Sequence, residues 1–185
     1  MNGSYLLKCE GVLTTKSTKL KKLHRHIAVR NSPIHGRGVF ALRRIPKGAR
    51  IIEYKGTLIT DKEADRRFGR LQENSAHTML FSVDGGMVID ATRRGNSARW
   101  INHSCAPNCD TYEKDKRMYI RAIRDIRPGE ELSYDYCIET NERITKEVKS
   151  RWPCWCGAKK CRGTVLVPTP KPKKKAKKKA KRRTG

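Results

Sequence analysis

Three cysteines within eight residues are the feature that most limits how this chain can fold: Cys154, Cys156 and Cys161. Thiols this close together can wrap one zinc ion, but structural zinc takes four tetrahedral ligands, with sulfur at about 2.3 Å. The fourth ligand must come from another part of the chain, and Cys105 and Cys109 are the two candidates. A metal joining residues so distant in sequence would pin this C-terminal module onto the preceding domain and complete a site there.

The other cysteines and the N-terminus favour metal binding over disulfides. The chain has seven cysteines, an odd number. Its N-terminus lacks the apolar stretch of a secretory signal, because Lys8 and Glu10 interrupt the short apolar run before them. Both observations point to a reducing compartment. Cysteines that are merely buried in a core are the alternative, but three of them among polar and basic neighbours fit that alternative poorly.

The positive charge lies mostly at the two ends of the chain. The formal net charge is +25, and residues 168–185 hold ten basic side chains and no acidic one. Residues 1–30 hold seven basic side chains and one acidic one, which leaves +9 for residues 31–167. We therefore expect a flexible basic arm at 1–25, a moderately basic globular middle and a disordered Lys/Arg-rich tail at 168–185. The basic, hydroxyl-rich residues 14–30 leave a transit peptide as an alternative.

Short apolar runs separated by turn residues predict a β-rich domain over residues 26–152 with few helices. Thr60 and Glu63 form a capping box that starts one helix, and residues 140–151 are a candidate second helix. No apolar run approaches the roughly 18–20 residues of a membrane helix, so we expect a soluble protein with no membrane partner. The predicted strands are Ile27–Val29, Val39–Ala41, Arg50–Tyr54, Met79–Val83, Met87–Asp90, Thr111–Glu113, Met118–Ala122 and Leu132–Tyr136.

Three segments carry residue types suited to binding or chemistry. The run from Gly36 to Ala41 matches the letters of a dinucleotide-binding fingerprint, but Pro46 and Gly48 leave no room for the helix that this motif requires. Its glycines more plausibly let the backbone pass close to a ligand or a neighbouring strand. Asn102 and His103 precede a candidate metal ligand, although a structural histidine is the usual explanation. Tyr134 and Tyr136 alternate along a strand, so both face the same side.

Taken together and in order, the chemistry-bearing segments resemble the SET domain with its post-SET zinc module, the protein-lysine methyltransferase family, over residues 26–166. The compact form is similar to small bacterial SET proteins. The segments that carry the resemblance are Gly36-Arg37-Gly38, Glu53-Tyr54-Lys55-Gly56, Gly95-Asn96-x-x-Arg99-x-Ile101-Asn102-His103-Ser104-Cys105-x-Pro107-Asn108-Cys109, Gly129-Glu130-Glu131-Leu132-Ser133-Tyr134-Asp135-Tyr136 and Cys154-x-Cys156-x-x-x-x-Cys161-Arg162-Gly163-Thr164.

The resemblance implies a mostly β fold of small sheets around a pseudoknot that Arg99 helps to hold, with a SET domain at 26–152 and a post-SET zinc module at 153–167. It implies catalytic roles for Tyr136, for Tyr54 in the lysine channel and for Tyr134 as a switch between product states. It also implies that Cys105, Cys154, Cys156 and Cys161 bind structural zinc, with Cys109, Cys137 and Cys9 as spare thiols. The implied contacts to S-adenosylmethionine are Gly36, Arg37, Gly38, Arg99, Asn102, His103, Tyr136 and Trp155.

The implied activity is transfer of a methyl group from S-adenosylmethionine to a lysine ε-amine, mainly as mono-methylation because of Tyr134. This chemistry needs alignment and a neutral amine rather than a protein nucleophile. Two departures from the family pattern stand out: Met79 occupies a position where many members have tyrosine, and Trp100 replaces a phenylalanine. The ring of Trp155 either covers the adenine of the cofactor or, like Trp152, simply packs the small module.

The expected protein substrate is a histone or a histone-like basic protein, or the chain itself. The competing hypothesis is a nucleic-acid-binding, chromatin-like protein with a degenerate SET domain, because the Lys/Arg-rich tail is suited to DNA or RNA. Such tails are also often only solvated. We expect an intracellular location, favouring the bacterial cytoplasm or nucleoid, with a host nucleus or chromosome as the alternative.

Overall fold

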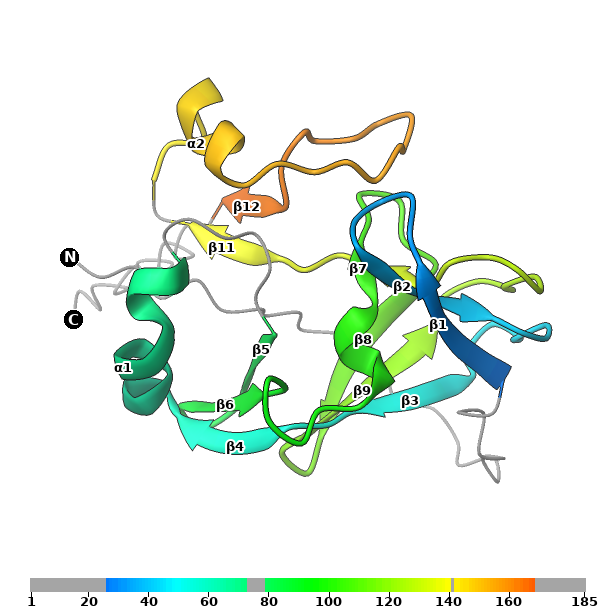
Figure 1. Ribbon diagram of the computed structural model, residues 1–185, viewed down its shortest axis with the longest axis horizontal. Helices are drawn as coiled ribbons and strands as arrows, with labels where there is room; N and C mark the ends of the chain where they lie inside the picture. Colours follow the sequence, from blue (N-terminus) through cyan, green and yellow to red (C-terminus); the bar gives the residue numbers. More distant parts are fainter. Residues whose placement is uncertain (1–25, 73–78, 141, 169–185) are drawn as a thin grey trace, which may run out of the picture.

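The computed structural model describes residues 26–72, 79–140 and 142–168 (Figure 1). The predicted arm at 1–25, Cys9 and the tail beyond Pro168 lie outside these residues. Within the described part, the chain forms many short strands and two α-helices, as the sequence pattern predicts. None of the helices in this part is long and apolar enough to cross a membrane.

The described strands form five small sheets rather than one large one. Three sheets are antiparallel: β1 pairs with β2, β9 lies between β3 and β8, and β6 lies between β4 and β5. These antiparallel strands are β1 (Ile27–Asn31), β2 (Arg37–Ala41), β3 (Arg50–Tyr54), β4 (Thr57–Thr60), β5 (Leu80–Val83), β6 (Met87–Asp90), β8 (Cys109–Lys114) and β9 (Arg117–Ala122).

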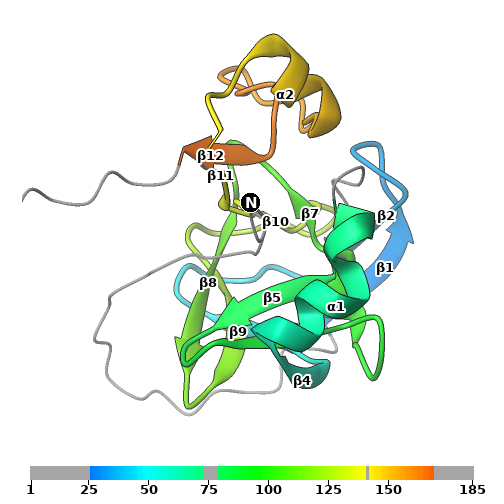
Figure 2. The ribbon, with the colours of Figure 1, turned by 90° about the vertical axis from the view of Figure 1, so that its left-hand side faces the viewer.

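Two parallel pairs join segments that are far apart in the chain: β7 (Asn102–His103) with β10 (Ser133–Tyr134), and β11 (Ile138–Thr140) with β12 (Leu166–Pro168). Figures 1 and 2 place β11, β12 and the second helix at one end of the molecule, away from the β4-β6-β5 sheet. The C-terminal segment is therefore held by pairing with the middle of the chain.

The helix α1 (Asp61–Gln72) begins where the capping box predicts. The Thr60 hydroxyl accepts a hydrogen bond from the Glu63 backbone N–H at 3.3 Å, which satisfies one free donor of the first turn. Ala64 is buried in a small cluster with residues of β4, β5 and β6, and Phe68 packs against it. Ala64 and Phe68, four positions apart on the helix, therefore mark the face that covers this sheet (Figure 2).

Two predicted elements are shorter in the structure. The helix α2 covers only Lys146–Arg151, capped by the Thr145 hydroxyl, because residues 138–140 form β11 instead of helix. The last predicted strand is reduced to Ser133–Tyr134, since the chain turns away beyond it and Cys137 adopts a left-handed φ of 49°. The rejection of a dinucleotide fingerprint is confirmed, because Arg37–Ala41 is strand β2 with no helix after it.

Candidate active site and cysteine cluster

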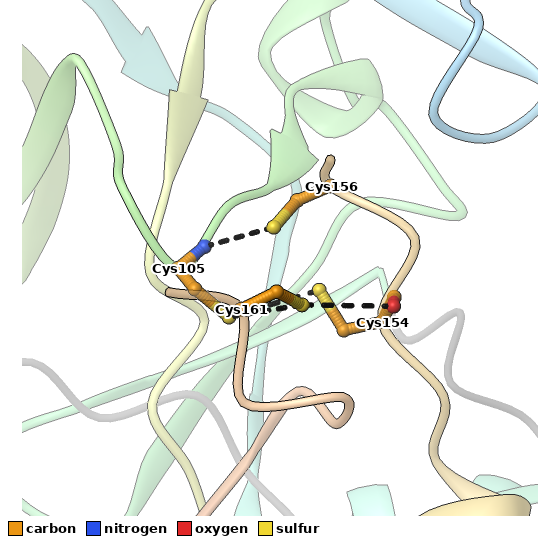
Figure 3. Close-up of side chains that lie close together, drawn as sticks. All are labelled: Cys105, Cys154, Cys156 and Cys161. Atoms are coloured by element: carbon orange, nitrogen blue, oxygen red, sulfur yellow. Dashed lines mark hydrogen bonds between the residues drawn. The ribbon is translucent and has the colours of Figure 1, made fainter. Parts of the chain in front are cut away.

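Four cysteines meet between β7 and the segment that joins α2 to β12 (Figure 3). The sulfur atoms of Cys105, Cys154, Cys156 and Cys161 all lie within 4.8 Å of one another. Cys105 Sγ is 3.8 Å from Cys154 Sγ and 3.9 Å from Cys161 Sγ. Four sulfurs at about 2.3 Å from a tetrahedral ion would be separated by about 3.8 Å. The side chains present therefore fit a zinc ion.

The structure distinguishes between the two candidates for the fourth ligand. Cys105 lies in the cluster, whereas Cys109 is fully buried on β8 and its thiol donates to the Asn108 side-chain oxygen at 3.4 Å. Burial also raises the pKa of the Cys109 thiol to about 12, so it stays protonated. Of the two, only Cys105 is placed to share an ion with the C-terminal cysteines.

Backbone donors surround the cluster. Burial opposes ionisation of Cys156, but hydrogen bonds from the N–H groups of Cys105 and Ala158 and from the thiols of Cys154 and Cys161 together outweigh it and lower the pKa of this thiol to about 6. The Cys105 N–H lies 3.4 Å from Cys156 Sγ, and the Arg162 N–H lies 3.4 Å from Cys105 Sγ. Donors aimed at sulfur stabilise thiolates, the form in which cysteine binds a metal.

An ion pair joins the cysteine-containing segment to Asp135, the residue that follows β10. The Arg162 guanidinium makes a bidentate pair with the Asp135 carboxylate, with N–O distances of 2.6 and 2.8 Å. Burial disfavours the Asp135 carboxylate, but Arg162 more than compensates and lowers its pKa. Asp135 also lies 3.5 Å from the Nδ1 atom of His103. The module is thus coupled directly to residues of the predicted active site.

Five aromatic rings from different strands form a continuous buried row: Tyr54, Phe81, Tyr134, Tyr136 and His103. The successive ring centroids are 5.3, 6.1, 5.1 and 5.3 Å apart. All five side chains are buried. The three tyrosines that the resemblance marks as catalytic are therefore brought together from β3 and the β10 segment. The Tyr134 and Tyr136 rings lie 5.1 Å apart, although the strand from which the sequence predicts a shared face ends at Tyr134.

Two tyrosines of this row, Tyr54 and Tyr136, are neutral. Burial raises the pKa of both Tyr54 and Tyr136 well above its usual range. The Tyr136 hydroxyl donates to the Ile101 carbonyl at 2.9 Å, which fixes the position of its oxygen. Hydroxyls held in this way act as hydrogen-bonding groups and not as charged nucleophiles.

His103 is neutral as well, and its two nitrogens have distinct partners. Its Nδ1 accepts the Tyr136 backbone N–H at 3.1 Å, so the ring proton resides on Nε2, which donates to Cys105 Sγ at 3.4 Å. Burial lowers the pKa of His103 to about 4, with Asp135 opposing and Arg162 adding to the effect. The imidazole thus connects the backbone at Tyr136 to the cysteine cluster.

The loop at residues 32–38 is clamped onto β7. The Asn102 Nδ2 atom lies within 3.2 Å of four acceptors: the Ser32 hydroxyl, the His35 and Arg37 carbonyls and the Glu131 carboxylate. Ser32 also donates to Glu131 at 2.8 Å. Sequence reasoning missed Ser32 and the role of Glu131, although Glu131 lies within one of the quoted motifs.

The two glycines of this loop serve different purposes. Gly36 has a left-handed φ of 45°, which glycine adopts without strain. At Gly38, an added Cβ would stand 2.2 Å from Glu131 Oε1 and 2.9 Å from the Ser32 Cβ. Gly38 is therefore small because the Glu131 carboxylate occupies the space beside it.

Aromatic and guanidinium groups surround the same loop. Trp155 is 60% exposed and stacks on His35, with centroids 6.0 Å apart and planes at 9°. The Arg37 and Arg99 guanidiniums lie 5.3 and 4.6 Å from the Trp100 ring centroid. Trp152, by contrast, is 1% exposed and belongs to the core. The sequence left open which tryptophan packs the core. In the structure Trp152 does so, whereas Trp155 is exposed beside the loop that holds the candidate cofactor-binding residues.

Comparisons with known proteins agree with this geometry. The family model described as SET domain matches residues 36–137. A histone-lysine N-methyltransferase, H3 lysine-4 specific, of Chaetomium globosum is 41% identical over 150 residues, 78% of this chain and 14% of its own length. Trithorax of Drosophila virilis is 39% identical over 81% of this chain, and human histone-lysine N-methyltransferase 2B is 40% identical over 77%. The chain spans 4% and 5% of those two relatives.

A solved structure of ctPRC2, in an autoinhibited conformation bound to S-adenosylmethionine, is similar with a TM-score of 0.55 and 34% identity. The similarity covers 60% of this chain and 15% of that one. A structure of Chaetomium thermophilum Polycomb Repressive Complex 2 bound to GSK126 matches equally well. With more than half of its length matched by the family model, the chain belongs to the SET-domain family.

Proposed function

We propose that this chain is an S-adenosylmethionine-dependent protein-lysine N-methyltransferase acting on a histone or a histone-like basic protein, or on itself. The observation that carries the proposal is the buried aromatic row from Tyr54 to His103, in which the hydroxyls of Tyr54 and Tyr136 are neutral. Relatives named as histone-lysine methyltransferases and a similar structure bound to S-adenosylmethionine support it.

The cofactor would supply an activated methyl group, and the residues around loop 32–38 fit it. Gly36, Arg37 and Gly38 present backbone held by Asn102, while the exposed Trp155 ring offers a stacking surface next to His35. The side-chain nitrogens of Asn102 and His103 are engaged inside the fold, so these residues would serve mainly by shaping the loop and the Tyr136 backbone. Arg99, which donates to the Ala91 carbonyl at 3.1 Å and lies over Trp100, would support the same region.

The aromatic row would prepare the substrate lysine. A lysine is an ammonium ion at pH 7 and attacks only after losing a proton. Burial among Tyr54, Phe81 and Tyr134 disfavours the charged form, and a nearby sulfonium cation adds repulsion. The neutral hydroxyls can then hold the amine, and weak C–H···O contacts can orient the methyl group. With its pKa lowered to about 4 and Nδ1 occupied, His103 supports the backbone rather than acting as a base.

Zinc would have a structural part. Cys105, Cys154, Cys156 and Cys161 would hold it, and four protein ligands leave no open position for chemistry. Its contribution would be to fix the module that carries Trp155 and Arg162 against β7 and β10.

Replacing Gly38 with alanine should weaken cofactor binding. The added methyl group displaces the Glu131 carboxylate, which breaks its hydrogen bonds with Ser32 and Asn102 and releases loop 32–38. We expect KM for S-adenosylmethionine to rise about tenfold or more, since losing one charged hydrogen bond costs about 1.5–3 kcal/mol, with a smaller change in kcat. Initial rates at varied S-adenosylmethionine concentration give KM and kcat, and titration calorimetry with the cofactor gives the binding constant itself. Glu131→Gln keeps the shape and should have a milder effect; an unchanged KM in Gly38→Ala contradicts the clamp.

The direct test of the function is labelled-methyl transfer from S-adenosylmethionine onto core histones, bacterial DNA-binding proteins and the chain itself, with mass-spectrometric mapping of the modified lysines. Methylation of histone lysines would support the proposal and name the site. The proposal would be overturned if no methyl group were transferred to any of these proteins and the chain did not bind the cofactor.

Tyr134 should limit the number of methyl groups added. Its ring lies between Phe81 and Tyr136, and removing its hydroxyl enlarges the space beside the amine. We expect the wild-type chain to give mainly mono-methyl lysine, and Tyr134→Phe to shift the product towards di- and tri-methyl lysine. Mass spectrometry of a methylated peptide at long reaction times reads the ratio. An unchanged product distribution contradicts this role.

The Lys/Arg-rich tail at 168–185 is proposed to associate with DNA or RNA. The support is its ten basic residues without an acidic one. Deleting 169–185 should weaken binding to nucleic acid and spare activity on a free peptide. The alternative, a nucleic-acid binder with a degenerate domain, requires Tyr136→Phe to leave every activity unchanged.

The relatives named above come from fungi, a fly and human, which supports a nuclear, chromatin-associated location; the bacterial location stays a prediction.

A further inference from the structure

Two exposed loops, residues 42–49 and 123–131, lie side by side at the edge of the molecule opposite α1 (Figure 1). Each loop carries one fully buried isoleucine, Ile45 or Ile126, with exposed residues on both sides of it. The sequence repeats one spacing here, Ile45-x-x-Gly48-x-x-Ile51 and Ile126-x-x-Gly129-x-x-Leu132, and the two copies begin in these two neighbouring surface loops.

The loops are held rigidly together by backbone hydrogen bonds. Ile45 and Ile126 each donate to the other's carbonyl at 2.9 Å. Gly48 donates to the Ala122 carbonyl at 2.8 Å, and Ala122 donates to the Ala49 carbonyl at 3.0 Å. The backbone positions that carry these side chains are fixed relative to one another, so binding them costs less backbone entropy than binding an unstructured segment.

Cations outnumber anions on this surface. Arg44 pairs with Asp125, and Arg124 pairs with Glu130 at 2.8 Å. Three further exposed cations form no salt bridge within the described residues. These are Arg43, Lys47 and Arg127. Burial acts against ionisation of Glu130, but the nearby Arg127 charge helps to lower the pKa of that carboxylate. We call the five cations Arg43, Arg44, Lys47, Arg124 and Arg127 the loop-end surface.

His26, the first described residue, lies against the first of these loops. The Leu42 backbone N–H donates to the His26 carbonyl at 2.7 Å, so residue 26 is tied to the start of the first loop. Residues 1–25, which precede it directly in sequence, contain six basic residues and one acidic one.

We propose that the loop-end surface docks the phosphate backbone of duplex DNA. Duplex DNA is a dense, regular polyanion, and arginine presents a planar fork that matches phosphate oxygens. The regular spacing of charge along a duplex suits cations on two backbone-fixed loops, whereas a short acidic peptide would have to be ordered before it could match them. The site is separate from the aromatic row, so its loss should leave methyl transfer to a free peptide unchanged.

The test is the salt dependence of duplex binding by the full chain, measured by fluorescence anisotropy with a labelled DNA duplex. The variant Arg43→Ala/Lys47→Ala/Arg127→Ala removes the three unpaired cations. Each lost phosphate contact lowers the slope of log Kobs against log salt by about 0.9, so we expect the slope to fall by about two to three units. Affinity at physiological salt should fall by at least tenfold, roughly the difference that such a slope produces.

A charge-matched control carries Lys62→Ala/Lys116→Ala/Lys146→Ala on α1, the β8–β9 turn and α2, all exposed and away from the loops. It should change the slope by less than one unit. Equal effects of the two variants would overturn the proposal, because they would show a charge effect with no surface. So would a loop-end variant that loses binding to poly-glutamate while keeping its DNA slope, which would assign the surface to an acidic polypeptide. Unaltered peptide methylation in both variants keeps this result independent of the proposed enzyme function.

Discussion

Tyr136→Phe is expected to lower methyl transfer by about 100-fold or more, the scale seen when reacting groups are misplaced by about 1 Å. The Tyr136 hydroxyl is buried, neutral and oriented by its bond to the Ile101 carbonyl. It is therefore a preorganised oxygen at the end of the aromatic row, next to His103. Single-turnover transfer to a histone peptide isolates the chemical step, and cofactor affinity should change much less.

The matched control is Tyr112→Phe. Tyr112 stacks on Tyr119 at 5.5 Å and lies beneath the Arg121 guanidinium; it is on β8, which β9 separates from the Tyr54 strand β3, and within the described residues its ring makes no stacking contact with the row. It should retain nearly full activity. Losing the Tyr136 hydrogen bond to Ile101 costs about 1 kcal/mol, so a modest drop in melting temperature is expected. Wild-type single-turnover rates in folded Tyr136→Phe would remove this residue from the mechanism.

Local patterns predicted the parts of the fold that neighbouring residues determine. The β5–β6 hairpin across residues 84–86, the β8–β9 hairpin and the start of α1 all lie where turn and capping signals predict. The short parallel strands were not predictable in this way. Ser133 pairs with Asn102, and Ile138 with Leu166, so these strands exist only because distant segments meet.

The site shows the same division. Spacing alone limited the fourth cysteine to Cys105 or Cys109, and the resemblance selected Cys105, which the structure brings to the cluster. The reason that Gly38 is glycine could not be read from the sequence, because Glu131 lies 93 positions away and meets it only in the fold. Phe81 completes the aromatic row from β5, and no local signal marks it.

The cysteine cluster and the aromatic row form one connected structure. His103 links them, with Nε2 facing Cys105 Sγ and Nδ1 holding the Tyr136 backbone. The Arg162–Asp135 ion pair makes a second link from the module to the β10 segment. Loosening the module should therefore disturb the position of Tyr136, although no cysteine touches that ring in the contacts described.

Cys105→Ser should consequently abolish zinc binding and most of the activity. Serine is a poor zinc ligand, and Cys105 is the one member of the cluster that comes from the main domain. Zinc content should fall from about one ion per chain to well below half, as measured by a colorimetric chelator after unfolding. Methyl transfer should fall at least tenfold. Mutating a residue that only hydrogen-bonds to a metal ligand already costs about 10–100-fold in metal affinity or activity, and Cys105 is a proposed ligand itself.

Cys109→Ser provides the control, since Cys109 is the other cysteine that the spacing allowed. Its thiol donates to Asn108 Oδ1, and a serine hydroxyl can donate in its place. This variant should keep its zinc and most of its activity. The reverse outcome, with zinc lost from Cys109→Ser and retained by Cys105→Ser, would refute the four-cysteine site. If zinc is lost from Cys105→Ser with activity intact, the module holds its position through Arg162 and Asp135 alone, and the link through His103 carries no catalytic weight.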